Sequence, residues 1–401
     1  MIGMEPYRLL FPLGVAYAIA GALVWTVAAL GWMPYPGPLH RALMIQGFEQ
    51  SFVVGFLLTA LPGLTHSERC RPAELAAGFA AMAAFGVFAF GGWLLGAQIA
   101  GLAALLTLVV AAARRLGRRA PGPAEELLFV AFGLLAGLAG GALLAAQAAG
   151  APAWGPPRFA ERLLSLGMVL SLVLGVGGLL VPTFAGMRGP LVIPGVAGPH
   201  ERGPRRALYL SLIAVFVAAF TAEFLGRAVP GALLRAAAAS ALGLLVWKLF
   251  RLPGRRALSS FAMWGAGWLV IAGLWWVAAD PARPMAGLHV VFLGGFGLLT
   301  FAIATRVVVA HGGHGIAAEP VVLGPGVVTL LALGLIARLW ADFQPAVATM
   351  LLGASGALWA AGWALWGWRA LPRIARTAPP PRPAPAPIPV ASITHASPRR
   401  G

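Results

Sequence analysis

Histidine is the side chain with the most ligand chemistry to offer in this chain of 401 residues. A neutral imidazole nitrogen binds metal ions and haem iron. The single cysteine, Cys70, excludes a disulfide, a CxxC redox pair, an iron–sulfur cluster and a cysteine-rich metal site. The candidate ligands are therefore the seven histidines: His40, His66, His200, His289, His311, His314 and His395.

Glu49 is the acidic residue that we single out, because it lies near the middle of an apolar stretch. A carboxyl group at such a depth in a membrane is costly and is a functional candidate by default. Glu49 follows His40 by nine residues, which on a regular α-helix places the two on opposite sides. Glu49 then serves a proton path, or it is protonated and hydrogen-bonded within the core.

The composition predicts the kind of element that carries these residues. Hydrophobic residues make up 60% of the chain and charged residues 10%, against about 25% charged in soluble domains. The mean hydropathy is +0.85. A soluble globular protein is excluded, because there is too little polar surface to cover such a core. A helix needs about 20 apolar residues to cross a bilayer, so we expect an all-α protein with many spans.

Apolar stretches separated by breaks rich in proline, glycine or arginine predict twelve transmembrane helices. We place them at 11–31, 43–62, 73–90, 93–112, 127–149, 163–185, 207–226, 231–250, 258–279, 287–310, 321–340 and 346–368. Residues 1–370 form the transmembrane domain. Residues 371–401 are rich in proline and alanine and are expected to be a disordered cytoplasmic tail.

The net charge of +17 indicates how the chain is oriented in the membrane. With the N-terminus inside, 22 of the 29 basic residues fall on the inner side, as the positive-inside rule requires. Both termini are then cytoplasmic, and the excess of positive charge does not indicate a nucleic-acid partner. The remaining seven lie on the outer side: Arg41, Arg158, Arg162, Arg227, Arg235, Arg283 and Arg338.

This orientation brings His40 and His289 to the same depth, at the outer starts of the second and tenth spans. A flat macrocycle such as haem needs histidine nitrogens on its faces and small residues at its edge. Gly47 lies seven residues after His40, on the same face of a regular helix. Three glycines follow His289: Gly294, Gly295 and Gly297. The pair therefore predicts a bis-histidine haem b site; alternatively, each histidine caps its span at headgroup level.

Further charged groups lie at the ends of these spans. Arg338 ends the eleventh span on the outer side and is a candidate partner for a haem propionate; the alternative is an interfacial arginine beside Trp340. His66, His311 and His314 lie at inner ends with Arg306. They predict a second metal site or, more simply, cations near the end of a helix.

Several motifs resemble those of the NnrS family, bacterial twelve-span membrane proteins that contain haem and copper. The matching segments are HRALMIQG from His40 to Gly47, GFLLTALP from Gly55 to Pro62, LVPTF from Leu180 to Phe184, GGFGLLT from Gly294 to Thr300 and TRVVVAH from Thr305 to His311. The resemblance implies a bacterial inner-membrane protein linked to nitric-oxide stress and denitrification. It covers the order of spans through most of the chain.

The chain departs from the family's HxHEM pattern after the first histidine. Ala42 and Leu43 stand where the family has a second histidine and a glutamate, and Met44 remains. Leu180 stands where the family has an arginine before the proline of the sixth span. A copper site built on the missing side chains is therefore doubtful, and the chain resembles a divergent member.

The architecture also resembles subunit I of the haem–copper oxidases, a bundle of twelve helices whose low-spin haem is held by histidines on spans 2 and 10. The histidines of the oxidase copper site are absent, so oxygen reduction at a binuclear centre is not expected. The leading hypothesis is a haem protein that binds nitric oxide, detoxifies it, or transfers electrons to an unknown partner. The alternatives are a transporter that uses Glu49 and a cofactor-free structural or assembly protein.

Overall fold

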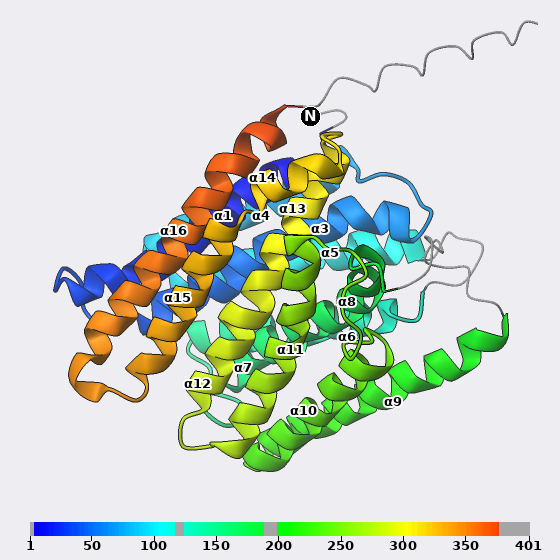
Figure 1. The fold of residues 1–401 in the computed structure, drawn as a ribbon. Helices are drawn as coiled ribbons and strands as arrows, with labels where there is room; N and C mark the ends of the chain where they lie inside the picture. Colours follow the sequence, from blue (N-terminus) through cyan, green and yellow to red (C-terminus); the bar gives the residue numbers. More distant parts are fainter. Residues whose placement is uncertain (1–3, 117–123, 188–198, 377–401) are drawn as a thin grey trace, which may run out of the picture.

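In a bilayer the backbone polar groups must be satisfied within the chain, so apolar segments become helices. The computed structural model describes residues 4–116, 124–187 and 199–376 (Figure 1). In these ranges eleven helices are long and apolar enough to cross a membrane, and a bent pair makes up to twelve. The all-α membrane class and the number of about twelve spans are confirmed.

The first six spans follow the predicted order, including the break at Gly91–Gly92. They are α1 (Tyr7–Ala29), the second span of α2 (Gly37–Arg41), η1 (Ala42–Glu49) and α3 (Gln50–Leu64), α4 (Pro72–Phe90), α5 (Leu94–Leu116), α6 (Leu127–Ala148), and the sixth span of α7 (Phe159–Arg162), η2 (Leu163–Val169) and α8 (Leu170–Phe184).

The second half begins with α9 (Pro199–Phe224), α10 (Ala228–Leu245) and α11 (Leu258–Ala279). The tenth span consists of α12 (Pro284–His289), η3 (Val290–Gly297) and α13 (Leu298–His311). After η4 (Ile316–Ala318), the chain continues through α14 (Glu319–Val322), α15 (Pro325–Ala341), η5 (Pro345–Val347) and α16 (Ala348–Ala375). His395 and most of the predicted tail lie outside the described residues.

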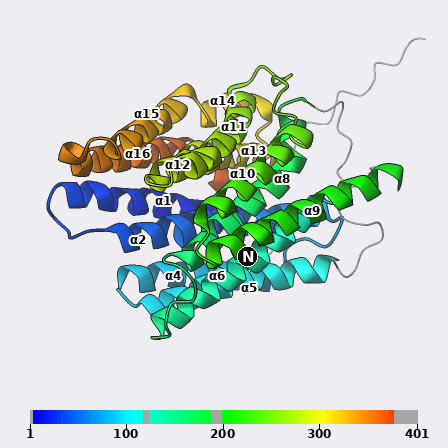
Figure 2. The same ribbon diagram turned by 90° about the horizontal axis from the view of Figure 1, so that it is seen from below.

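The second, sixth and tenth spans form the centre of the bundle. The share of buried residues is 72%, 89% and 78% in these spans, against 33–50% in the other unbroken ones. The same three spans contain the π-helical segments η1, η2 and η3. A π-helix closes i→i+5 hydrogen bonds and has a wider turn than an α-helix, and such turns often mark functional sites. Around this centre, α1 lies between α16 and the second span (Figure 2).

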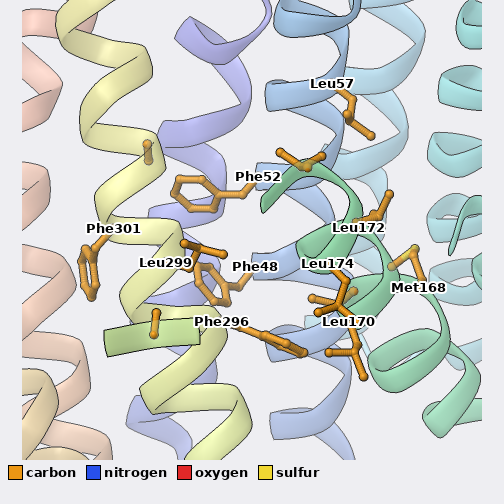
Figure 3. Packing of buried hydrophobic residues seen from close by; sticks show 14 of the residues in the cluster. Phe48, Phe52, Leu57, Met168, Leu170, Leu172, Leu174, Phe296, Leu299 and Phe301 are labelled. Atoms are coloured by element: carbon orange, nitrogen blue, oxygen red, sulfur yellow. The ribbon is translucent and has the colours of Figure 1, made fainter. Parts of the chain in front are cut away.

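Aromatic side chains fill the space between the central spans. Phe48 and Phe52 of the second span and Phe296 of the tenth lie between these two spans, whereas Phe301 lies on the other side of the tenth span (Figure 3). Phe301 stacks on Trp363 of α16, with the ring centroids 3.9 Å apart. Helix association in a membrane depends on close van der Waals packing, and these rings supply it.

The predicted eleventh span is bent by 43° between α14 and α15. Glu319, at the start of α14, is 3% exposed and accepts hydrogen bonds from Arg306 at 2.6 Å and Arg255 at 3.5 Å. A buried carboxylate is stable only when it is paired in this way. Arg306 therefore links the end of the tenth span to the eleventh.

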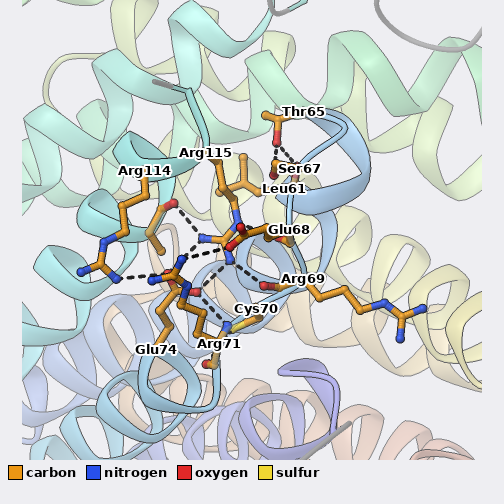
Figure 4. A network of polar contacts seen from close by, with 11 residues as sticks. Leu61, Thr65, Ser67, Glu68, Arg69, Cys70, Arg71, Glu74, Arg114 and Arg115 are labelled. Carbon is orange, nitrogen blue, oxygen red and sulfur yellow. Dashed lines mark hydrogen bonds and ion pairs between the residues drawn. The ribbon is translucent and has the colours of Figure 1, made fainter. Parts of the chain in front are cut away.

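A polar network closes the opposite end of the second span from His40 (Figure 4). The Arg115 side chain is 5% exposed and donates to Glu74 at 2.8 Å and to the carbonyls of Glu68 and Arg69. Cys70 lies in the same loop. Burial, and then the negative charge of Glu74, raise the pKa of the Cys70 thiol to about 12.

Because the thiolate is the nucleophile, this raised pKa predicts slow alkylation. At pH 8 a maleimide should label Cys70 of the folded protein at least about a hundredfold more slowly than the same thiol unfolded in SDS. Labelling should accelerate as the pH rises. Mass spectrometry of the labelled fraction against time measures both rates, with Cys70→Ser as the blank. Equal rates in the two states would contradict the described environment.

Candidate functional site

A cavity of about 520 Å³ lies at the end of the bundle where the second and tenth spans begin. Cofactor sites commonly measure 300–1,000 Å³. Residues from α1, the second, sixth and tenth spans, α15 and α16 line it. His40 and His289 are both on its wall, so the structure brings together the two histidines that the sequence paired.

Each imidazole is held by a backbone carbonyl. The Nδ1 atom of His40 lies 2.6 Å from the carbonyl oxygen of Gly21 in α1, and Nδ1 of His289 lies 2.8 Å from that of Met285 in its own helix. A carbonyl accepts and does not donate, so Nδ1 carries the proton in both rings. The lone pair of each Nε2 is then available, as in histidines that ligate metals.

Arginines surround the mouth of this cavity. Arg338 lies on its wall within electrostatic reach of both imidazoles, and its Nη1 donates to Asp342 at 2.8 Å. Arg158 and Arg162 line the same cavity. Arg158 has no acidic partner among the described residues and has a left-handed backbone, with φ of +64°. The sequence placed Arg158 and Arg162 on the outer side but did not connect them with the histidines.

The prediction that Glu49 faces away from His40 is wrong. A small cavity of about 60 Å³ is lined by Glu49, His40 and His289 together. The reason is η1, which begins two residues after His40. With i→i+5 hydrogen bonds, nine residues make about two turns and return to the same face.

The predicted edge of small residues is also wrong. An added Cβ at Gly47 would meet Tyr17 and Phe85, so Gly47 packs against α1 and α4 and does not line the cavity. Gly294 and Gly295 likewise pack against Leu269 and Val270 of α11. These glycines let neighbouring helices approach the π-helical segments, whereas the cavity walls are larger side chains such as Met44, Phe292 and Trp359.

Glu49 lies between two small cavities deeper in the bundle. It lines the cavity of about 60 Å³ that it shares with the histidines and a second one of about 80 Å³ bounded by Phe52, Val173 and Thr300, among others. Its carboxyl group makes no hydrogen bond or ion pair within the part of the chain that the structure describes. Sequence reasoning identified this residue, but not its neighbours.

The histidines at the other end of the bundle have separate partners. Nδ1 of His311 lies 3.1 Å from Glu5, and Nε2 of His314 lies 2.9 Å from the carbonyl oxygen of Arg373. His66 lines a different polar cavity beside Arg115. Across residues 4–116, 124–187 and 199–376, no three histidine, cysteine or acidic side chains form a group that could hold a metal ion. The side chain of His200 lies outside the description.

Fold and cavity together define a class: a polytopic helical membrane protein with two histidines facing one internal cavity. The family model for the NnrS protein matches residues 2–377, nearly the whole chain. The protein therefore belongs to the NnrS family. A search of the curated proteins found no match.

One wall of the cavity yields a stability prediction. A Cβ at Gly297 would lie 2.6 Å from the ring of Trp359, which is buried and donates to the carbonyl of Ala18 at 3.2 Å. Gly297→Ala should therefore lower the thermal midpoint in detergent, by the equivalent of about 1–3 kcal/mol for overpacking. Gly63→Ala is the matched control, because its Cβ would meet nothing within 4 Å. Equal midpoints for both variants would show that Trp359 is not confined as described.

Proposed function

We propose that this NnrS protein binds haem b between His40 and His289 and acts in the bacterial response to nitric oxide. The observation that carries the proposal is the pair of Nδ1-anchored imidazoles on one cavity of about 520 Å³. Membership of the NnrS family supports the link to nitric oxide. We place the protein in the bacterial inner membrane, with both termini cytoplasmic and this cavity on the outer side.

The residues on the cavity wall fit a haem. His40 and His289 would hold the iron through their Nε2 atoms, and apolar side chains such as Met44, Phe292 and Trp359 would surround the macrocycle. Arg158, Arg162 and Arg338 are the cations available for two propionates, because charge-assisted hydrogen bonds to carboxylates are the strong ones. Arg158 is the best placed by charge, since it has no acidic partner among the described residues.

When bound in this way, the haem would supply one-electron chemistry. With His40 and His289 both holding the iron, no ligand position would remain open for a diatomic gas. This favours electron transfer or sensing over catalysis on the gas. Carbonyl acceptors at both Nδ1 atoms also raise the basicity of Nε2, which strengthens ligation.

The visible spectrum of the purified protein tests this proposal. We expect the reduced α-band of a six-coordinate b haem in the wild type. His40→Ala and His289→Ala should each abolish that band or convert it to a five-coordinate spectrum, because each removes one axial nitrogen. Spectra are recorded in detergent after reduction with dithionite, with haem content measured as the pyridine haemochrome.

His66→Ala is the matched control, because His66 lies at the opposite end of the second span. It should leave the spectrum unchanged. A colourless wild-type protein that elutes as a folded species would overturn the proposal. A transport assay with Glu49→Gln would then test the alternative of a transporter.

A further inference from the structure

A second polar cavity adjoins the histidine cavity at the same end of the bundle. Its volume is about 270 Å³, and it lies between the second span, α5, α6 and α7. Arg41, Ile45 and Glu161 line both cavities. Nε of Arg41 donates to Oε1 of Glu161 at 2.9 Å. This ion pair therefore lies between the two cavities.

Three glutamines give the second cavity its chemistry. Gln46 and Gln98 are 3% and 4% exposed, and Gln147 lies near the end of α6. Nε2 of Gln46 donates to Oε1 of Gln98 at 2.8 Å. Oε1 of Gln46 and Nε2 of Gln98 make no hydrogen bond with the residues that the structure describes. One acceptor and one donor are therefore left for a ligand, because buried polar groups require partners.

The charges of this cavity fit a neutral ligand. Arg41 and Glu161 neutralise each other, so no cation is left over for a phosphate or a carboxylate. Basic pockets with unpaired cations are the ones that suit anionic lipid headgroups. The amide groups instead match a ring that carries carbonyl or hydroxyl oxygens.

Part of the cavity wall is apolar. Leu94, on its wall, is 58% exposed, and Leu144 and Ile45 continue the apolar lining. Gln98 lies four residues into α5, about one turn from the end of the helix. A ligand with a polar ring and an apolar tail would place its ring among the glutamines and its tail along α5 and α6.

We infer that this cavity is a binding site for the headgroup of a membrane quinone. The ring oxygens would accept from Gln98 and, in the quinol form, donate to Gln46. The ion pair of Arg41 and Glu161 would then separate the ring from the cavity of His40 and His289. This site depends on the glutamines and does not require a bound haem. The inference can therefore be tested separately from the proposed function.

Binding of decylubiquinone to the purified protein in nanodiscs tests the inference. Isothermal titration calorimetry, corrected with empty nanodiscs, should show saturable binding to the wild type. Gln98→Leu removes the free donor and should weaken binding about tenfold. Gln50→Leu is the matched control, because Gln50 is equally buried but donates to the carbonyl of Gly101 and does not line the cavity. It should leave the affinity unchanged.

Two further results separate this inference from the haem proposal. His40→Ala should retain quinone binding, and Gln98→Leu should retain the visible spectrum of the wild type. A wild type that holds only phospholipid and shows no saturable uptake of decylubiquinone would overturn the inference. Equal weakening in Gln98→Leu and Gln50→Leu would do the same, because it would trace the effect to packing.

Discussion

The arrangement of the site depends on the wide backbone turn that follows each histidine. In a membrane the spanning backbone must satisfy its own hydrogen bonds, and a π-helix still does so with i→i+5 pairs. Its wider turn changes which side chains share a face. Through η1 and η3, the walls of the cavity become Met44, Phe292 and other large groups, while the glycines turn toward neighbouring helices. The three spans with π-helical segments also have the largest buried shares among the described spans.

The sequence predicted the parts of the molecule that obey regular rules. Apolar length predicted the spans, and the places of His40 and His289 at the starts of the second and tenth spans predicted that the two would meet. The orientation of Glu49 and Gly47 could not be predicted, because a regular helix was assumed and no residue type marks a π-helical turn. The sequence did not connect Arg158 or Gly21 with the histidines for a different reason: Arg158 reaches the cavity, and the carbonyl of Gly21 reaches His40, only through tertiary structure.

The structure gives local roles to most of the arginines that the sequence assigned to the outer side. Four of the seven assigned to that side, Arg41, Arg158, Arg162 and Arg338, line the histidine cavity. Arg41 and Arg338 are paired with Glu161 and Asp342. A fifth, Arg235, is 1% exposed and pairs with Glu223 at 2.7 Å. These five arginines therefore line this cavity or pair with an acidic side chain.

The two imidazoles are anchored differently, and this makes them unequal. His289 is held by a carbonyl four residues earlier in its own helix, so ring and anchor move as one body. His40 is held by Gly21, which belongs to α1, so its orientation depends on the register between two helices. Sliding or tilting of α1, as a change in bilayer thickness would cause, reaches one ring and not the other. The position of the His289 ring is thus fixed relative to its own helix, whereas the position of the His40 ring changes with that of α1.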